Sequence, residues 1–307
     1  MAEAWPRYRP DWRAVGWLTA VLIVVTSLPT VLGSALQTPQ LTYTGARWFS
    51  PQDASVYYSW IQQAADGEWL LSNRFSAEQN VRGTLNLYWV VVGKLAALLG
   101  LSPMAAFALA RLASIPLMVL AIDFFASRVL RSAGDRRWGV GLACLASGWG
   151  FLLLPWMDAT PDLFTGVPAT PVDLWVPEAT LVHTALHSGH LAAAVAVLAV
   201  LAGAWINALR FGRPRSALAA GLWSALLFSF HPFEAVLVGS VVLVTTAVAA
   251  VRGLRPAWVL AGVWALAASP PLLVHLWSLG DPRVAARAAQ NVILSPSVAT
   301  LPWALGL

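Results

Sequence analysis

Three histidines, His183, His187 and His190, have the clearest chemical spacing in this chain. They occupy positions i, i+4 and i+7, so we expect one face of one helix to carry all three. An i, i+4 histidine pair suits a divalent metal ion. Asp173 and Glu178 could add oxygen ligands, and the predicted set is Asp173, Glu178 and His183 around Mg²⁺ or Mn²⁺. Two alternatives stay open, namely histidine contacts to a phosphate or sugar, and a polar helix entrance with no ligand.

Asp53 is the second group of interest, because a carboxylate at a membrane surface can act as a general base. Ser50 followed by Pro51 is typical of a helix N-cap and first helical position. Asp66-Gly67 is typical of a helix end. The pattern predicts an amphipathic helix of about 14 residues that lies along the outer membrane surface. Asp53 falls in its first turn, where the alternative is an ordinary helix-start acid facing water.

Three further polar side chains lie in or beside apolar runs, where ionisable residues are costly and are functional candidates by default. His231 and Glu234 share a short turn, and we expect them to face the same side as the three histidines. A plain polar turn is the alternative. For Asp123 we favour a structural ion pair, with Arg128 or Arg111, over a catalytic role.

The composition places these groups in a membrane protein. The 307-residue chain is 58% hydrophobic and 11% charged, and its mean hydropathy is +0.67. Soluble domains carry about 25% charge. The single cysteine, Cys144, excludes a disulfide framework. The net charge of +5 is typical of cytoplasmic arginine loops, so we expect a lipid bilayer as partner and no nucleic acid.

We therefore expect an all-α, polytopic bundle of about seven to eight transmembrane helices, with amphipathic juxtamembrane helices in its first outer loop. Residues 1–307 would form one transmembrane domain, with residues 37–83 and 157–187 as the first and second extracytoplasmic loops. The last residues do not resemble a finished C-terminus, so truncation there stays an alternative. The candidate spans are 14–36, 84–101, 103–127, 138–156, 188–209, 216–230, 233–251 and 256–279.

Three short loops rich in arginine, 128–137, 210–215 and 252–255, predict the orientation. The positive-inside rule places them in the cytoplasm together with the N-terminus. The region between the outer loop 37–83 and the inner loop 128–137 then raises a conflict. It holds two apolar runs, 84–101 and 103–127, whereas an outer loop and an inner loop must be separated by an odd number of crossings. We favour a re-entrant or interfacial segment at 84–101 over an arginine loop that breaks the rule.

The order of these segments resembles a known family. Four segments follow one another over residues 14–140: an apolar helix, an outer loop with an acid and Asp66-Gly67-Glu68-Trp69, the aromatic Leu87-Tyr88-Trp89, and Ala110-Arg111-Leu112-Ala113-Ser114. This layout is similar to the N-terminal module of the GT-C superfamily of membrane glycosyltransferases. The protein O-mannosyltransferase and lipid A aminoarabinose transferase branches show it most clearly. Two departures indicate a divergent branch: Ala54 after the acid, and Gly83-Thr84-Leu85-Asn86 in place of a Pro-Pro segment.

The resemblance implies an enzyme that moves a sugar from a polyprenyl-phosphate donor to an acceptor on the outer face of a bacterial plasma membrane. It implies that Asp53 is the catalytic base and that Arg111 lies near the donor phosphate. Oligosaccharyltransferases of this superfamily hold a cation between their first two outer loops, which would join Asp53 to Asp173 and Glu178. A single acidic base without a covalent partner implies inversion. The residues expected to bind substrate are Tyr57, Tyr58, Arg74, Arg82, Arg111, His187, His190, His231 and Glu234.

Two other classes of function remain. A transporter or flippase for a lipid-linked or small polar substrate would use the same histidine, glutamate and arginine side chains, but would tolerate loss of Asp53. A non-catalytic scaffold subunit would use them for assembly. The sequence shows no nucleotide-binding glycine loop and no serine nucleophile elbow, so cytoplasmic nucleotide chemistry is not expected.

Overall fold

The computed structural model describes residues 8–43, 51–75, 83–152, 171–282 and 285. Within these residues the chain is helical and its β-type contacts are isolated bridges, so the predicted all-α architecture is confirmed. The helices are α1 (Trp12–Ala35), α2 (Pro51–Ala65), α3 (Leu87–Leu99), α4 (Pro103–Val129), α5 (Ala133–Leu145), α6 (Val172–Trp175), η2 (Pro177–Ala179), α7 (Leu181–His187), α8 (Gly189–Phe211), α9 (Pro214–Phe228), α10 (Glu234–Val251) and α11 (Ala257–Leu279).

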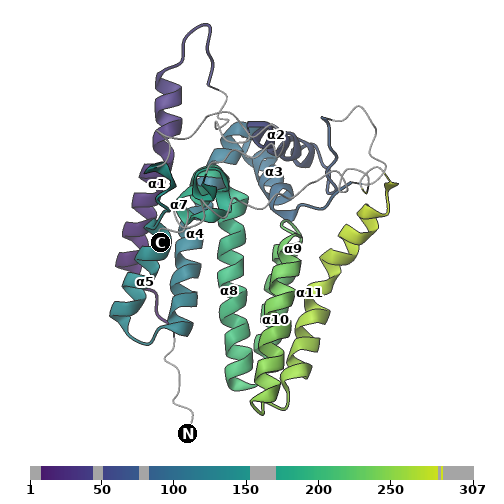
Figure 1. Cartoon of the computed structure of the whole chain (residues 1–307). Coiled ribbons are helices and arrows are strands. Elements are labelled where there is room, and N and C mark those ends of the chain that lie inside the picture. The colour runs from purple at the N-terminus through teal and green to yellow at the C-terminus, as the bar shows by residue number, and fades with distance from the viewer. Residues whose placement is uncertain (1–7, 44–50, 76–82, 153–170, 283–284, 286–307) are drawn as a thin grey trace.

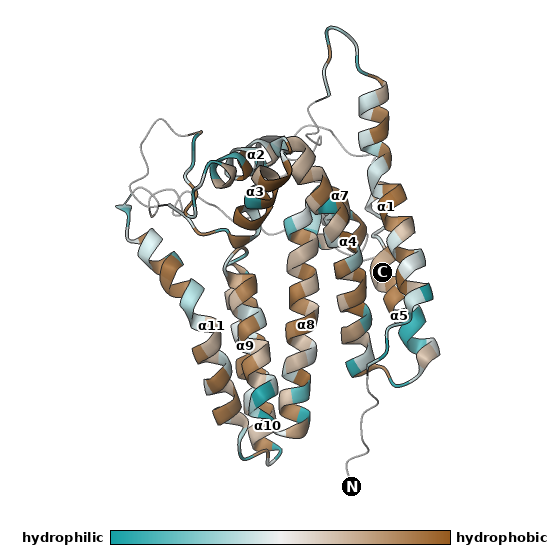
Figure 2. Cartoon of the chain, turned by 180° about the vertical axis from the view of Figure 1, so that it is seen from behind, coloured by the Kyte–Doolittle hydropathy of each residue, from teal (hydrophilic) through white to brown (hydrophobic). Residues whose placement is uncertain are grey.

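In the described part of the chain, five helices are long and apolar enough to cross a bilayer: α1, α4, α8, α10 and α11. Their outward sides carry large apolar residues, and Leu32, Val244 and Leu266 are 57%, 60% and 78% exposed. Contiguous apolar surface of this kind marks contact with lipid or with another protein. Figure 2 shows brown, hydrophobic residues along most of these helices. The five helices indicate a multi-pass integral membrane protein.

The predicted run 138–156 is wrong as a single helix. α5 ends at Leu145, and residues 146–152 leave the helical path, while the last residues of the run lie outside the described residues. Gly148 and Gly150 explain the break, because glycine weakens a helix by about 1 kcal/mol relative to alanine. The backbone N–H of Gly150 also donates to Asp173 Oδ2 at 3.1 Å, which holds this turn against α6.

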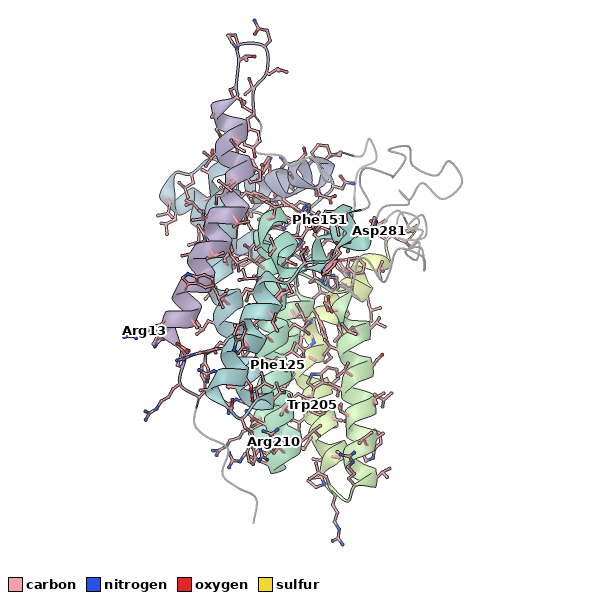
Figure 3. All side chains as sticks on the ribbon, turned by 60° about the vertical axis from the view of Figure 1, so that its left-hand side comes forward. Arg13, Phe125, Phe151, Trp205, Arg210 and Asp281 are labelled. Carbon is pink, nitrogen blue, oxygen red and sulfur yellow. The ribbon has the colours of Figure 1, made fainter. Side chains whose placement is uncertain are left out.

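The helices turn at two opposite ends. The loops α4–α5, α8–α9 and α10–α11 lie at the same end as the start of α1 (Figure 1). Arg210 Nη2 donates to the carbonyl oxygen of Arg128 at 3.1 Å, which ties two of these loops together. Figure 3 shows Arg13 and Arg210 in this half of the molecule and Phe151 and Asp281 toward the other. The three arginine loops therefore share one end, which we call the arginine-loop end.

The opposite end carries α2 and α3, which pack on each other (Figure 1). The helix predicted after Ser50 is present as α2, and it buries Ile61 and Ala64. α3 has 13 residues and is about 20 Å long, too short for a hydrocarbon core of about 30 Å. α3 is therefore shorter than the five helices that could cross a membrane. Gly93 allows the close contact, because a Cβ atom there would overlap the carbonyl oxygen of Ile61.

α8 stands at the centre of the bundle, between α4 on one side and α9 on the other. One apolar core joins α1, α4, α5 and α8, and a second joins α8, α9, α10 and α11. A third core joins α2 and α3 to the start of α4 through Ile61, Trp89 and Phe107. This third core positions the site described next.

Candidate functional site

Three aromatic rings stack at the α2–α3 end of the bundle. The ring centre of Tyr57 on α2 lies 4.9 Å from that of Trp89 on α3, and Trp89 lies 5.6 Å from Phe107 on α4. The two pairs are 22° and 11° from parallel. Tyr58 meets the edge of Phe107 at 5.3 Å. Tyr57, Trp89 and Phe107 come from α2, α3 and α4, so their stack holds α2 and α3 on α4, with Trp89 and Phe107 buried.

His190, in the first turn of α8, contacts this stack. Its ring centre lies 4.8 Å from Tyr57, 5.4 Å from Trp89 and 6.0 Å from His231. The Ser188 hydroxyl and His190 Nδ1 are 2.7 Å apart, so one imidazole nitrogen is held by the chain itself. We call Tyr57, Trp89, Phe107, His190 and His231 the histidine–aromatic cluster.

Glu234 extends the cluster on the α9–α10 turn. His231 Nδ1 lies 3.7 Å from Glu234 Oε1, and both side chains are less than a quarter exposed. Within the described residues, His231 Nδ1 and Glu234 Oε2 are buried and have no hydrogen-bond partner. Buried polar atoms in native proteins are almost always paired, so these two atoms have the capacity to bond a ligand or water.

Asp53 on α2 and Glu178 on η2 both act electrostatically on Tyr57. Burial raises the pKa of the Tyr57 hydroxyl, and the negative charges of Asp53 and Glu178 raise it further. Tyr57 is therefore a neutral phenol at physiological pH. Both carboxylates lie on exposed residues, where water or an acceptor can reach them.

An apolar groove of about 560 Å³ opens beside the cluster, between α3, α4, α8 and α9. Tyr88 and Phe230 line it next to His190, whose ring centre lies 6.3 Å from that of Tyr88. Along α4 the lining runs from Ser114 to Phe124, about 15 Å of helix. The groove therefore leads from the histidine–aromatic cluster into the hydrophobic part of the bundle.

No protein-family model, curated protein or solved structure matches this chain. The interpretation of the site therefore depends on its own geometry. That geometry combines exposed carboxylates and histidines beside a buried aromatic stack with an apolar groove, which suits a substrate that is polar at one end and a lipid at the other.

The structure corrects the prediction that three histidines share one face of one helix. His183 and His187 belong to α7, whereas His190 belongs to α8, and Ser188 between them has extended backbone angles. Gly189 is required at this break, because a Cβ atom would overlap the Tyr88 hydroxyl and the backbone of Ala110. A serine–glycine pair at a helix start was the available signal in the sequence.

The predicted metal ligands do not form one coordinating group. Asp173 is buried and uses Oδ2 to hold the Gly150 amide, while Glu178 is exposed near Tyr57. Burial lowers the pKa of the His183 imidazole, and a hydrogen bond with the Asp173 backbone opposes this shift. The described residues include no group of three or more side chains placed to bind a metal ion. The cation implied by the resemblance therefore stays a prediction.

The predicted arginines lie in different environments. Arg111 is buried; its Nη1 donates to Thr26 Oγ1 at 2.8 Å and to the carbonyl oxygen of Ala185 at 3.2 Å, and its Nη2 donates to Ser27 Oγ at 3.1 Å. It therefore joins α4 to α1 and α7, one helical turn from Phe107. Arg74 is exposed after α2, and Arg82 lies outside the described residues.

Asn86 was not predicted to belong to the site. Its Oδ1 accepts from the Trp89 amide and its Nδ2 donates to the carbonyl oxygen of Phe230 at 3.2 Å. Asn86 thus caps α3 and ties it to the turn that carries His231. The N-cap preference of asparagine is visible in the sequence. Its partner is 144 positions away, so the long-range bond is visible only in the fold.

Proposed function

We propose that this protein is a membrane glycosyltransferase of GT-C type. It moves a sugar from a polyprenyl-phosphate donor to an acceptor at the α2–α3 end of the bundle. The observation that carries the proposal is the apolar groove, which opens next to the histidine–aromatic cluster and two accessible carboxylates. A polyprenyl chain fits the groove, and its phosphate and sugar then meet the polar side chains.

The orientation follows from the arginine loops. With the arginine-loop end in the cytoplasm, the α2–α3 end faces the extracytoplasmic side. α2 and α3 then lie in the outer interface, with α3 too short to cross. The same orientation places the N-terminus in the cytoplasm, in a bacterial plasma membrane as the resemblance implies.

Glycosyl transfer requires few groups, and this end of the bundle offers them. Asp53 accepts the proton of the acceptor hydroxyl as its oxygen forms a bond to the anomeric carbon. The bond from that carbon to the donor phosphate oxygen breaks, and the polyprenyl phosphate leaves with the electron pair. His190 and His231 stabilise the phosphate by hydrogen bonds. Tyr57 and Tyr58 hold the sugar, and the product is inverted at the anomeric carbon.

The groove also favours a second candidate, a transporter or flippase for a lipid-linked substrate. Its lining reaches from Phe230 near the cluster to Tyr8 near the arginine-loop end. A path of this length could guide a lipid tail while the headgroup moves between leaflets. Such a protein would need His231 and Glu234 but not a base at Asp53.

The deciding experiment measures sugar transfer in membranes that contain the full chain, with radiolabelled polyprenyl-phosphate hexoses as donors. We expect wild-type protein to transfer sugar and Asp53→Asn to lose at least about 100-fold of the rate. Asp66→Asn is the matched control, because Asp66 is an exposed acid just after the same helix, and it should keep full activity. A parallel reaction with EDTA measures whether sugar transfer depends on a metal ion. Transfer unaffected by Asp53→Asn would overturn the assignment of the base.

The groove has its own test. Ala193 lines it on α8, so Ala193→Phe should slow transfer from long-chain donors about tenfold and spare donors with short chains. Val244→Phe is the control, because Val244 lies on the lipid-facing side of α10 and is 60% exposed. Equal effects of Ala193→Phe on long and short donors would show that the groove does not hold the lipid tail.

A further inference from the structure

The apolar groove has a closed end, opposite the histidine–aromatic cluster. Its lining begins at Tyr88 and Phe230 beside the cluster and ends at Phe124 on α4 and Val200 on α8. Tyr8 lines the groove at the same level as Phe124, because the two ring centres are 5.2 Å apart. We call Phe124 and Tyr8 the groove floor.

Phe124 fills the space between α4 and α8 at this level. A Cβ atom at Gly203 would overlap Cε1 of the Phe124 ring, so the ring lies close against the backbone of α8. The Arg128 guanidinium, one turn further along α4, lies over the same ring at 4.7 Å from its centre. A hydrocarbon chain that passed Phe124 would meet this charge, and placing apolar chain against a buried charge is costly. The groove is therefore closed by shape and by charge.

Tyr8, the other half of the groove floor, is held through its ring and through its hydroxyl. The ring meets Phe124 edge-on, with the two planes 86° apart. The hydroxyl donates to Asp123 Oδ2 at 3.0 Å, and Asp123 Oδ1 lies 3.0 Å from Arg136 Nε. The groove floor is thus supported by α4, by α5 and by the segment before α1, so a lipid chain does not displace it easily.

We propose that the groove floor sets the length of lipid tail that the bundle holds. The occupant is the prenyl chain of the lipid-phosphate donor, so this inference rests on the proposed function and adds a length limit to it. The lining from Ser114 to Phe124 covers about 15 Å of α4, which is close to the length of an extended farnesyl chain. The rest of a longer chain leaves the groove sideways past Leu117, which lines the groove and is 59% exposed.

The test measures the affinity of prenyl phosphates for the full chain in neutral detergent, by native mass spectrometry. Geranyl, farnesyl and geranylgeranyl phosphate differ by one isoprene unit at each step. With wild-type protein the affinity should rise from geranyl to farnesyl phosphate and then level off. Phe124→Ala lowers the floor, so geranylgeranyl phosphate should bind it about tenfold more tightly than farnesyl phosphate does. Val200→Phe raises the floor, so farnesyl phosphate should bind it no better than geranyl phosphate.

Two further variants separate the length limit from general damage to the fold. Phe125→Ala is the matched control, because Phe125 is the neighbouring half-buried ring on α4 and lies outside the groove lining. It should keep the wild-type dependence on chain length. Phe124→Leu retains more of the packing than Phe124→Ala and should shift the dependence in the same direction, so the test does not depend on whether Phe124→Ala folds.

Three outcomes would overturn the proposal. These are an affinity for wild-type protein that continues to rise beyond farnesyl phosphate, the same chain-length dependence in wild type, Phe124→Leu and Val200→Phe, and no binding of any prenyl phosphate. Sugar transfer is measured on the same proteins. Normal transfer with an unchanged length dependence would remove the length limit and leave the proposed function. The expected length dependence without transfer would do the reverse.

Discussion

The two ends of the bundle hold their buried acids in opposite ways. At the arginine-loop end, Asp123 has a partner at each oxygen, with Arg136 and Tyr8 both at 3.0 Å. At the α2–α3 end, Glu234 approaches His231 only to 3.7 Å, and its Oε2 has no hydrogen-bond partner within the described residues. A fully paired acid holds helices together, whereas an incompletely paired one keeps bonding capacity for a substrate.

This difference agrees with the structural ion pair that the sequence favours for Asp123, and it sets Glu234 apart. Either acid, in or beside an apolar run, counts as a functional candidate. Asp123 on α4 contacts Arg136 on α5 and Tyr8 before α1, so it connects these three parts of the chain. Glu234 instead lies beside His231 of the histidine–aromatic cluster. Three predictions follow from the comparison, ordered by the size of the expected effect.

Asp123→Ala should give the largest loss of stability. It removes the carboxylate that Arg136 Nε and the Tyr8 hydroxyl contact, each at 3.0 Å, and this loss costs about 1–3 kcal/mol. We expect a lower yield of folded protein and a lower free energy of unfolding, measured by SDS titration of the protein in mixed micelles. Asp135→Ala, an exposed acid on the neighbouring α5, should cost less than about 1 kcal/mol.

A repair variant keeps this prediction falsifiable. Asp123→Leu combined with Arg136→Met removes both charges, and it should recover most of the stability lost by Asp123→Ala. If the repaired protein is as unstable as Asp123→Ala, the pair is not what joins these helices. If Asp123→Ala is as stable as wild type, Asp123 does not hold these helices together, and the two ends do not differ in this way.

Glu234→Gln should instead change activity while leaving stability nearly unchanged. The substitution removes the charge beside His231 but breaks no hydrogen bond of Oε2. We expect sugar transfer to fall about tenfold or more, with the unfolding free energy within about 1 kcal/mol of wild type. Glu68→Gln, an exposed acid at the same end, should alter neither quantity. Full activity in a destabilised Glu234→Gln protein would make this acid structural and remove the distinction from Asp123.

Local sequence signals predicted local structure well. Pro51 and Asp66-Gly67 predicted α2, which spans Pro51–Ala65. The arginine loops predicted a shared end, and short polar interruptions predicted most helix limits. The prediction of one helix over residues 138–156 was wrong. Average hydropathy does not reflect two glycines or a turn that is held by the distant Asp173.

The candidate site was harder to predict, because it is assembled from contacts between distant segments. Helical periodicity assumed a continuous helix through His187 and His190, yet Gly189 packs against Ala110 and the helix is interrupted. Asp123 was expected to pair with Arg128 or Arg111, but its partner is Arg136 on α5. In each case the residue type was evident from the sequence, whereas its neighbour was determined by tertiary packing.

The smallest predicted effect concerns pH and the His183 imidazole of α7. Burial lowers the folded-state pKa of His183 below about 6.5, its ordinary value in an unfolded chain. Between these two values the unfolded chain binds more protons than the folded chain, so stability rises with pH. The stabilisation is complete above about pH 6.5 and is lost as pH falls through that value toward the folded pKa. Thermal unfolding at pH 7.5 and 5.5 should therefore show a smaller decrease for His183→Gln than for wild type, and an identical decrease would show that this histidine is not buried in the folded protein.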